Sequence, residues 1–395
     1  VLGMKKFTTA ALALCMATLM GCSSSDDEDE LVLPEIVNQF ETDVVWQESV
    51  GDGVEHYFSR LTPAVYKDTV YVASREGQIE ALSLDNGDTK WETDVRQDLS
   101  FWPWADNGNA KLSGGILQAY GKIYIGSEHG FIIALDRETG EEVWRKNVPG
   151  ESLSKPTAGD GLIFVNLGSG KLLALHPDTG EERWSFEQEV PPLTLRGQSS
   201  PTVANGGVLV GLETGKLSVL ISDSGYSAWS AEIAVAKGAS EFERLVDVDT
   251  QPLISGPYAY AIAYNGNLAA VDIRSGNVVW KREYSSYREI AMDAQTIYLV
   301  DSDGVIYALD KNSGIERWSQ PALRGWYLTG PAVAGSHLAL GDQEGNLHWL
   351  NKETGELVSR EDFDSSGFFV EPVVADDKLI LYTRDGEVSM VKIPN

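Results

Sequence analysis

The chain has 395 residues, 43% of them hydrophobic, and its 59 acidic against 31 basic side chains give a formal net charge of −28 at pH 7. Nucleic acids and anionic membrane surfaces repel such a surface, so the composition argues against both as partners. The hydrophobic content is enough for one large core or for several small cores side by side.

Residues 1–21 have the order of an export signal. Two lysines follow Met4, where we expect translation to begin, and the apolar run from Phe7 to Met20 is too short to span a bilayer. The run leads into Leu-Met-Gly-Cys, which resembles the lipobox of bacterial lipoproteins. That resemblance implies cleavage before Cys22 and lipidation of Cys22, and Ser23 after it implies an outer-membrane destination. An ordinary signal with a chance cysteine is the alternative.

Residues 22–35 include the run SSSDDEDE, which cannot bury apolar surface and is predicted to be a flexible acidic tether. Cys15 lies in the cleaved signal and Cys22 would carry lipid, so the mature protein has no disulfide and depends on packing for stability. Loss of residues 1–21 removes two lysines and no acid, which moves the net charge from −28 to about −30.

The remaining residues, 36–395, repeat one hairpin. In the copy GFIIALDRETGEEVW, residues 130–144, a glycine precedes an apolar strand, a second glycine ends the turn, and a tryptophan lies in the outgoing strand. The second glycine supplies the left-handed conformation of a type I turn with a bulge, and the indole can fill the wedge between neighbouring sheets. Five further copies keep glycine and tryptophan fourteen residues apart: Gly77–Trp91, Gly170–Trp184, Gly215–Trp229, Gly266–Trp280 and Gly304–Trp318.

Two more strands precede each hairpin. The first is a short stretch of small residues, often led by proline, such as Ser200–Val203, which suits a strand crowded around an axis. The second is a β-branched run such as Thr69–Ala73. Four strands per unit, repeating every 38 to 53 residues, indicate an all-β fold of the β-propeller type.

The two ends of the repeat region are complementary fragments. A copy from Gly345 has Ser359 in place of tryptophan, and a copy from Gly386 stops before its turn, whereas Trp46 has no glycine start before it. We therefore expect Val44–Trp46 to supply the outer strand of the last unit. This predicts an eight-bladed propeller of four-stranded blades, closed by the N-terminal strand; a solenoid of hairpins is the alternative, but it would not need complementary ends.

The repeat pattern Ala-Leu-Asp-x-x-Thr-Gly-x-x-x-Trp is similar, over residues 40–395, to the repeat of quinoprotein dehydrogenases that bind pyrroloquinoline quinone. Those enzymes add adjacent cysteines, a calcium site and often a Cys-x-x-Cys-His haem segment, and the mature chain has no cysteine for them. The five histidines show no metal-ligand spacing. We predict no catalytic residue, cofactor or metal; a quinoprotein-like dehydrogenase or another ligand-binding periplasmic propeller is the alternative.

Two segments outside the repeat could bind a partner, since loops on a rigid scaffold often do. In PPLTLRGQ, residues 191–198, leucines flank a threonine and precede an arginine, and the segment is either a loop with apolar anchors or a buried strand. In RLVDVD, residues 244–249, alternation puts both aspartates on one side, where they could simply be solvated. Because the segments belong to consecutive blades, we expect them to lie close together.

The segments LTLRGQSSP and RLVDVD in consecutive blades resemble the BamB family of outer-membrane protein assembly factors, across essentially the whole mature chain. The resemblance implies a non-catalytic lipoprotein, anchored at the periplasmic face of the outer membrane, that binds the POTRA region of BamA and supports insertion of β-barrel proteins. It also implies that these residues bind the POTRA region: Leu193, Leu195, Arg196, Asp247 and Asp249. Unfolded client proteins could add a strand at a blade edge, although such edges are normally short and protected.

A third segment outside the repeat, Phe101–Trp104, is rich in aromatic residues. It could form a second recognition site or pack over one face of the propeller. We favour packing.

Overall fold

The computed structural model describes residues 31–96 and 108–394. The expected signal sequence, Cys22 and most of the tether lie outside these ranges, as does the aromatic segment Phe101–Trp104. Residues from Pro34 onward form one compact unit. Within the described ranges there is no helix able to cross a membrane, and the secondary structure consists of 32 strands.

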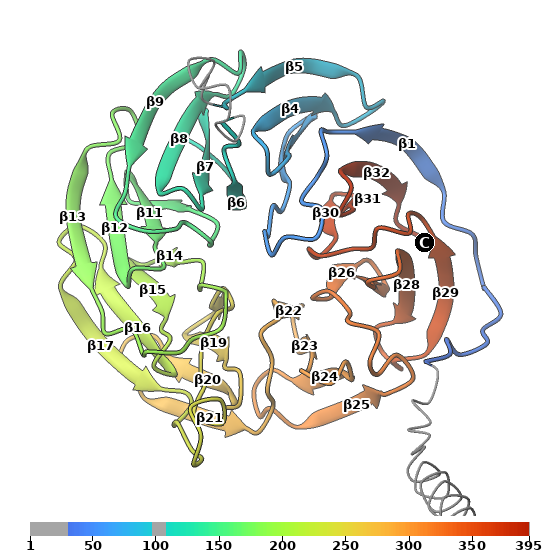
Figure 1. Ribbon diagram of the computed structural model, residues 1–395. Coiled ribbons are helices and arrows are strands. Elements are labelled where there is room, and N and C mark those ends of the chain that lie inside the picture. The colour runs from blue at the N-terminus through green and yellow to red at the C-terminus, as the bar shows by residue number, and fades with distance from the viewer. Residues whose placement is uncertain (1–30, 97–107, 395) are drawn as a thin grey trace, which may run out of the picture. The chain divides into compact units, whose positions relative to one another are not determined.

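The strands form eight separate four-stranded antiparallel sheets arranged as a ring (Figure 1). Each sheet is one blade, numbered here in chain order, with its first strand nearest the axis. Blades 1 to 4 consist of β2 (Ala64–Tyr66), β3 (Thr69–Ala73), β4 (Gln78–Ser83) and β5 (Thr89–Asp94); β6 (Leu112–Ala119), β7 (Lys122–Ser127), β8 (Phe131–Asp136) and β9 (Glu142–Asn147); β10 (Thr157–Gly159), β11 (Leu162–Asn166), β12 (Lys171–Leu175) and β13 (Glu182–Glu187); and β14 (Thr202–Ala204), β15 (Gly207–Gly211), β16 (Lys216–Ile221) and β17 (Ser227–Glu232).

Blades 5 to 8 continue the series. They consist of β18 (Leu253–Ser255), β19 (Tyr258–Ile262), β20 (Leu268–Asp272) and β21 (Val278–Arg282); β22 (Ala291–Met292), β23 (Thr296–Val300), β24 (Ile306–Asp310) and β25 (Glu316–Gln320); β26 (Ala332–Ala334), β27 (His337–Gly341), β28 (Asn346–Asn351) and β29 (Leu357–Asp362); and β30 (Val373–Ala375), β31 (Lys378–Tyr382), β32 (Glu387–Lys392) and β1 (Val44–Ser49). The predicted eight-bladed propeller is confirmed.

Closure of the ring follows the predicted route. β1 pairs antiparallel with β32, with Trp46 opposite Met390 and Gln47 opposite Ser389. The order of the eighth blade is therefore β1-β32-β31-β30, in which the N-terminal strand is the outermost. The last strand of the chain is held on both sides, by β1 and by β31.

The tryptophan of one blade lies against the turn glycine of the next blade. Trp144 donates its indole N–H to the carbonyl oxygen of Pro177 at 2.9 Å. A Cβ on Gly180, which has φ +68°, would lie 2.8 Å from the indole ring, so this glycine is required for space as well as for its backbone conformation. The same contact recurs in the pairs Trp46/Gly87, Trp91/Gly140, Trp184/Gly225, Trp229/Gly276, Trp280/Gly314 and Trp318/Gly355.

Ser359 interrupts this series for a structural reason. In the eighth blade β32 pairs with β1 instead of continuing through a hairpin, and the N-terminal segment packs where the turn of the next blade would cover a tryptophan. Ser359 Oγ donates to the carbonyl oxygen of Phe40 at 2.8 Å, and Trp349 Nε1 donates to Thr42 Oγ1 at 3.1 Å. The missing tryptophan and the missing turn are thus one feature of ring closure.

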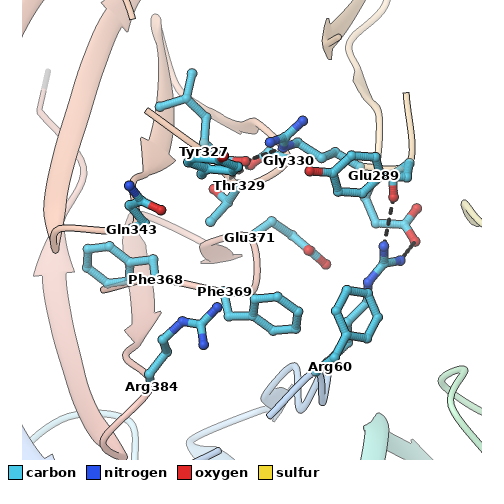
Figure 2. Close-up of a pocket in the computed structure, with 14 residues that line it drawn as sticks. Arg60, Glu289, Tyr327, Thr329, Gly330, Gln343, Phe368, Phe369, Glu371 and Arg384 are labelled. Atoms are coloured by element: carbon cyan, nitrogen blue, oxygen red, sulfur yellow. Dashed lines mark hydrogen bonds and ion pairs between the residues drawn. The ribbon is translucent and has the colours of Figure 1, made fainter. Parts of the chain in front are cut away.

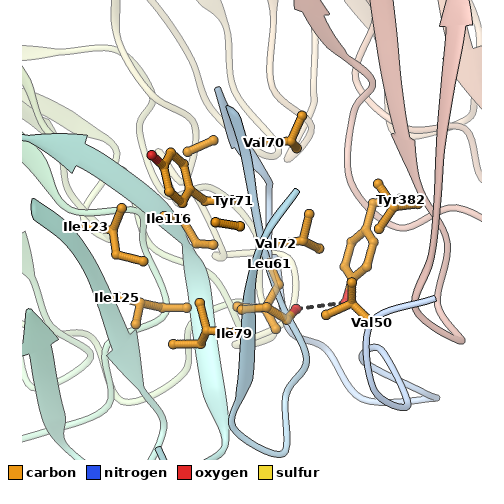
Figure 3. Close-up of a cluster of buried hydrophobic side chains, with 14 of the residues drawn as sticks. Val50, Leu61, Val70, Tyr71, Val72, Ile79, Ile116, Ile123, Ile125 and Tyr382 are labelled. Atoms are coloured by element: carbon orange, nitrogen blue, oxygen red, sulfur yellow. Dashed lines mark hydrogen bonds between the residues drawn. The ribbon is translucent and has the colours of Figure 1, made fainter. Parts of the chain in front are cut away.

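The hydrophobic core is divided among the blades. Separate clusters of buried side chains join neighbouring sheets, one of them spanning blades 8, 1 and 2. Figure 3 shows part of this cluster, in which Val70 and Val72 of β3 lie between Ile125 on one side and Tyr382 on the other. Tyr382 Oη also donates to the carbonyl oxygen of Ala73 at 2.8 Å. The hydrophobic residues therefore form several small cores rather than one large core.

Candidate partner-binding site

The two segments singled out in the sequence lie side by side on one face of the ring. Residues 191–198 connect β13 to β14, and residues 244–249 lie in the connection from β17 to β18. The backbone N–H of Leu195 donates a hydrogen bond to Asp247 Oδ2, which joins the two connections directly. The predicted proximity of these segments is confirmed, and the first of them is a loop rather than a buried strand.

The loop presents its side chains unequally. Leu193 and Leu195 are half-buried, whereas the side chain of Arg196 is 45% exposed. Arg196 pairs with Glu128 Oε2 at 3.0 Å and with Glu151 Oε2 at 3.3 Å. Glu128 in turn pairs with Arg75 at 2.9 Å. This chain of charges crosses the loops of successive blades and fixes the direction of the exposed guanidinium group.

The two aspartates lie behind the loop and not on the surface. Asp247 is 1% exposed and Asp249 is 2% exposed. A Cβ on Gly197 would lie 2.8 Å from Asp249 Oδ2, so the loop passes directly over this carboxyl group. The aspartates therefore support the loop from beneath, and solvated aspartates are excluded at both positions.

Burial of these acids changes their protonation. Burial and the charge of Asp247 raise the pKa of Asp249 to about 8. Burial raises the pKa of Asp247 to about 6, against the opposing hydrogen bond from Leu195. Glu213 from the β15–β16 connection is the third member, since burial and Asp247 raise its pKa to about 7. The three carboxyl groups therefore all have pKa values raised toward neutral pH.

A cavity of about 230 Å³ opens beside the loop. Half-buried aromatic side chains from three other blades share its walls with the predicted residues. Its lining consists of Phe58, Arg60, Leu195, Arg196, Asp249, Tyr264 and Tyr287. Aromatic residues and arginine in a partly desolvated pocket are the composition of a protein-binding hot spot. The three aromatic residues were not predicted, because each comes from a blade-to-blade or strand-to-strand loop that carries no repeat signal.

The connection that carries the aspartates also exposes an aromatic residue, Phe242, which the sequence does not predict. Phe242 is 73% exposed, and it precedes the buried segment that begins at Leu245. An aromatic ring exposed to this degree is apolar surface on the same connection as the aspartates.

Quinoprotein chemistry requires a calcium ion beside the quinone, held by carboxylate and amide ligands. Within the described ranges, the group of three carboxylates close enough to share a cation is Asp52, Glu55 and Glu76, in loops of the first blade. The cavity on the ring axis holds Lys155 together with Glu289 and Glu371, and these do not form such a group. A negatively charged quinone with its calcium ion does not fit this residue set.

The architecture defines an eight-bladed β-propeller of the quinoprotein-repeat type. Its fold is shared with quinohemoprotein alcohol dehydrogenase from Comamonas testosteroni, at a TM-score of 0.71 and 15% identity over 90% of this chain and 78% of the dehydrogenase. The crystal structure of BamB from Moraxella catarrhalis is similar at a TM-score of 0.79 and 25% identity, over 89% of this chain and 100% of that protein.

Sequence relatives are closer. The chain is 40% identical to the outer membrane protein assembly factor BamB of Yersinia pestis over 377 residues, 94% of this chain and 95% of the relative. It is 40% identical to that of Vibrio cholerae over 393 residues, 99% and 100% of the two chains. The family model of the outer membrane protein assembly factor BamB matches residues 100–320 and 323–393. This chain belongs to the BamB family.

Proposed function

We propose that the protein is a non-catalytic scaffold of the outer-membrane β-barrel assembly machinery that docks on the POTRA region of BamA. Lipid on Cys22 anchors it to the periplasmic face of the outer membrane, and the acidic tether allows it to reach its partner. Tethering raises the effective concentration of the propeller at the membrane, so a modest docking affinity is enough.

In this proposal, Leu193, Leu195 and Arg196 contact BamA. Asp247 and Asp249 are positioning residues that act through the loop. The observation that carries the proposal is the hydrogen bond from Leu195 N–H to buried Asp247, because it holds two half-buried leucines and one exposed arginine in a fixed arrangement. A rigid loop loses little conformational entropy on binding.

Co-purification of BamA in detergent with the tagged protein tests the proposal. Leu195→Asp should lower capture by about 30-fold or more, because a charge would enter an apolar hot spot worth roughly 2 kcal/mol. Arg196→Glu should also weaken capture, and more strongly at low salt, where charge repulsion is less screened.

Ile221→Asp is the matched control. Ile221 ends β16 and is 45% exposed, and the antiparallel order of the blade puts it on the opposite face of the ring. It carries the same change in charge and should leave capture intact. Unchanged capture by Leu195→Asp and Arg196→Glu, with circular dichroism like that of the unsubstituted protein, would contradict the assigned surface.

A further inference from the structure

A cavity of about 170 Å³ lies on the axis of the ring. Every blade contributes at least one residue to its wall, within or just before its innermost strand. Lys155 and Glu371 each stand directly before a proline that leads into β10 or β30. Because proline fixes its own backbone and restricts the preceding residue, both charged side chains start from rigid positions.

Three side chains at this cavity, those of Lys155, Glu371 and Gln198, have charged or polar atoms without a hydrogen-bond partner among the described residues. Within the described residues, no hydrogen bond or ion pair joins Lys155 Nζ or the Glu371 carboxylate to another side chain. Gln198 is 5% exposed, and its Oε1 atom has no hydrogen-bond partner. Charged groups and hydrogen-bond acceptors that are removed from water without a partner lower the free energy of unfolding, unless another molecule pairs with them.

A second cavity, of about 160 Å³, adjoins the first and shares Arg60, Glu289 and Glu371 with it. Figure 2 shows the Glu371 side chain pointing into this second cavity, with Phe369 and Arg384 at one side and Arg60 at the other. Arg60 approaches Glu289 at 3.8 Å and donates to the carbonyl oxygen of Tyr287 at 2.7 Å. The two cavities therefore meet at the ion pair of Arg60 and Glu289.

The charges around the axis balance. Lys155 and Arg60 contribute two positive charges, and Glu289 and Glu371 contribute two negative ones. A small anion would meet both carboxylates as well as the net charge of −28, and a small cation would meet the ammonium and guanidinium groups. A molecule with opposite charges a few ångströms apart can satisfy both sides, with a donor left over for Gln198 Oε1.

We propose that the axial cavity is a binding site for a small zwitterion of the α-amino-acid type. Its carboxylate faces Lys155, and its ammonium group faces Glu371 and Gln198. Binding here is separate from docking on BamA, because Leu193, Leu195 and Arg196 do not line the axial cavity.

Calorimetric titration and thermal unfolding of the full-length protein in detergent test this site. The probes are glycine and L-alanine, with acetate and methylammonium as compounds that carry one charge only. The amino acids should bind saturably, one per chain, and at concentrations far above the dissociation constant should raise Tm by about 2 °C or more. Acetate and methylammonium should do neither.

Lys155→Met and Glu371→Gln should abolish the shift given by glycine. Lys216→Met is the matched control, because Lys216 is exposed at the start of β16 and lies outside the cavity. Lys155→Arg keeps the positive charge and should retain weakened binding, which separates loss of the site from loss of folding. Capture of BamA should persist in all four variants.

Absence of saturable amino-acid binding up to about 50 mM, where occupancy would still reach half for a Kd of the same value, would overturn the proposal. Equal binding to the Lys155→Met protein, or equal shifts from acetate and methylammonium, would also overturn it. None of these outcomes changes the result expected for Leu195→Asp in the capture experiment.

Discussion

Asp247 and Asp249 act on the loop of residues 191–198 in different ways. Asp247 accepts the N–H of Leu195, so it fixes one point of the loop backbone. Asp249 lies under Gly197, where a larger residue at position 197 would collide with its carboxyl group. Both effects require buried acids, and burial is what displaces their pKa values upward.

The pH dependence of stability follows from these carboxyl groups. Asp249, Glu213 and Asp247 have pKa values of about 8, 7 and 6 in the folded protein, above the ordinary values of 3.8, 4.5 and 3.8. The folded state therefore binds more protons than the unfolded state between about pH 4 and pH 8, and their contribution to stability is lost as the pH rises through this window. The groups near them include Leu195 N–H and the more distant Arg60 and Glu289.

We expect the free energy of unfolding in urea to fall between pH 5 and pH 8.5, by roughly 2 kcal/mol or more from Asp249 alone, since each displaced unit of pKa is worth about 1.4 kcal/mol. Asp249→Asn should flatten this slope and raise stability at pH 8.5. Glu241→Gln, an exposed carboxyl group on the same connection, is the control and should leave the slope unchanged. An equally steep slope in Asp249→Asn would contradict the prediction.

At the level of residues, the sequence predicts that the two loops are in contact, but it does not predict that Asp247 and Asp249 are buried. Alternation in RLVDVD shows that the aspartates share a side, and consecutive blades show that the loops are neighbours. Neither pattern shows that the aspartates are buried, because the loop that buries them lies 52 residues away along the chain. The aromatic wall of Phe58, Tyr264 and Tyr287 is assembled from three separate blades and has no local signature at all.

At the level of strands, the contact between tryptophan and glycine explains why the repeat keeps a fixed spacing. The indole must reach the turn of the next blade, and the turn must expose a glycine to it. The strand Thr69–Ala73 was predicted to the residue, because its β-branched and aromatic run is bounded by the polar turn residues Lys67 and Asp68 on one side and by the turn that ends at Gly77 on the other.

The innermost strands of blades 2 and 6 were harder to predict. β6 contains Gly114 and Gly115 at φ +86° and +94°, and its pairing with β7 is irregular there. β22 is only two residues long and has no proline before it. A kinked strand and a minimal strand both lack the regular alternation on which strand prediction depends.

The pairing of β1 with β32 can be tested by a cross-link. Gln47 and Ser389 are directly opposite each other, so cysteines at both positions should form a disulfide that joins residues 342 apart in sequence. A loop of this length should add about 3 kcal/mol or more to the stability of the oxidised protein relative to the reduced protein. Tm measured with and without reductant gives the difference.

The out-of-register pair Gln47→Cys with Glu387→Cys serves as the control, because Glu387 pairs with Ser49. It should cross-link slowly and stabilise less. Efficient bonding of this pair together with failure of the in-register pair would contradict the observed register.

For the whole molecule, the net charge of −28 is the dominant electrostatic feature. Like charges repel one another more strongly in the compact state than in the unfolded chain, so the repulsion opposes folding. The Debye length falls from about 30 Å at 0.01 M salt to about 10 Å at 0.1 M. Screening over this range should therefore stabilise the propeller.

We expect Tm to rise by about 1 °C or more, roughly 1 kcal/mol in stability, when NaCl is increased from 0.01 M to 0.3 M at pH 7.5. The same series in choline chloride should give a similar rise, because screening does not depend on the identity of the cation. A fall in Tm with salt would show that the surface ion pairs, such as Lys122 with Asp178, outweigh the repulsion.

The position of β32 protects two sheet edges at once. Its neighbours are β31, which precedes it in the chain, and β1, which comes from the opposite end of the repeat region. A variant without β32 would leave both of these strands with unpaired backbone groups, and unpaired edges are templates for aggregation. One strand therefore guards the closed ring against self-association on both of its sides.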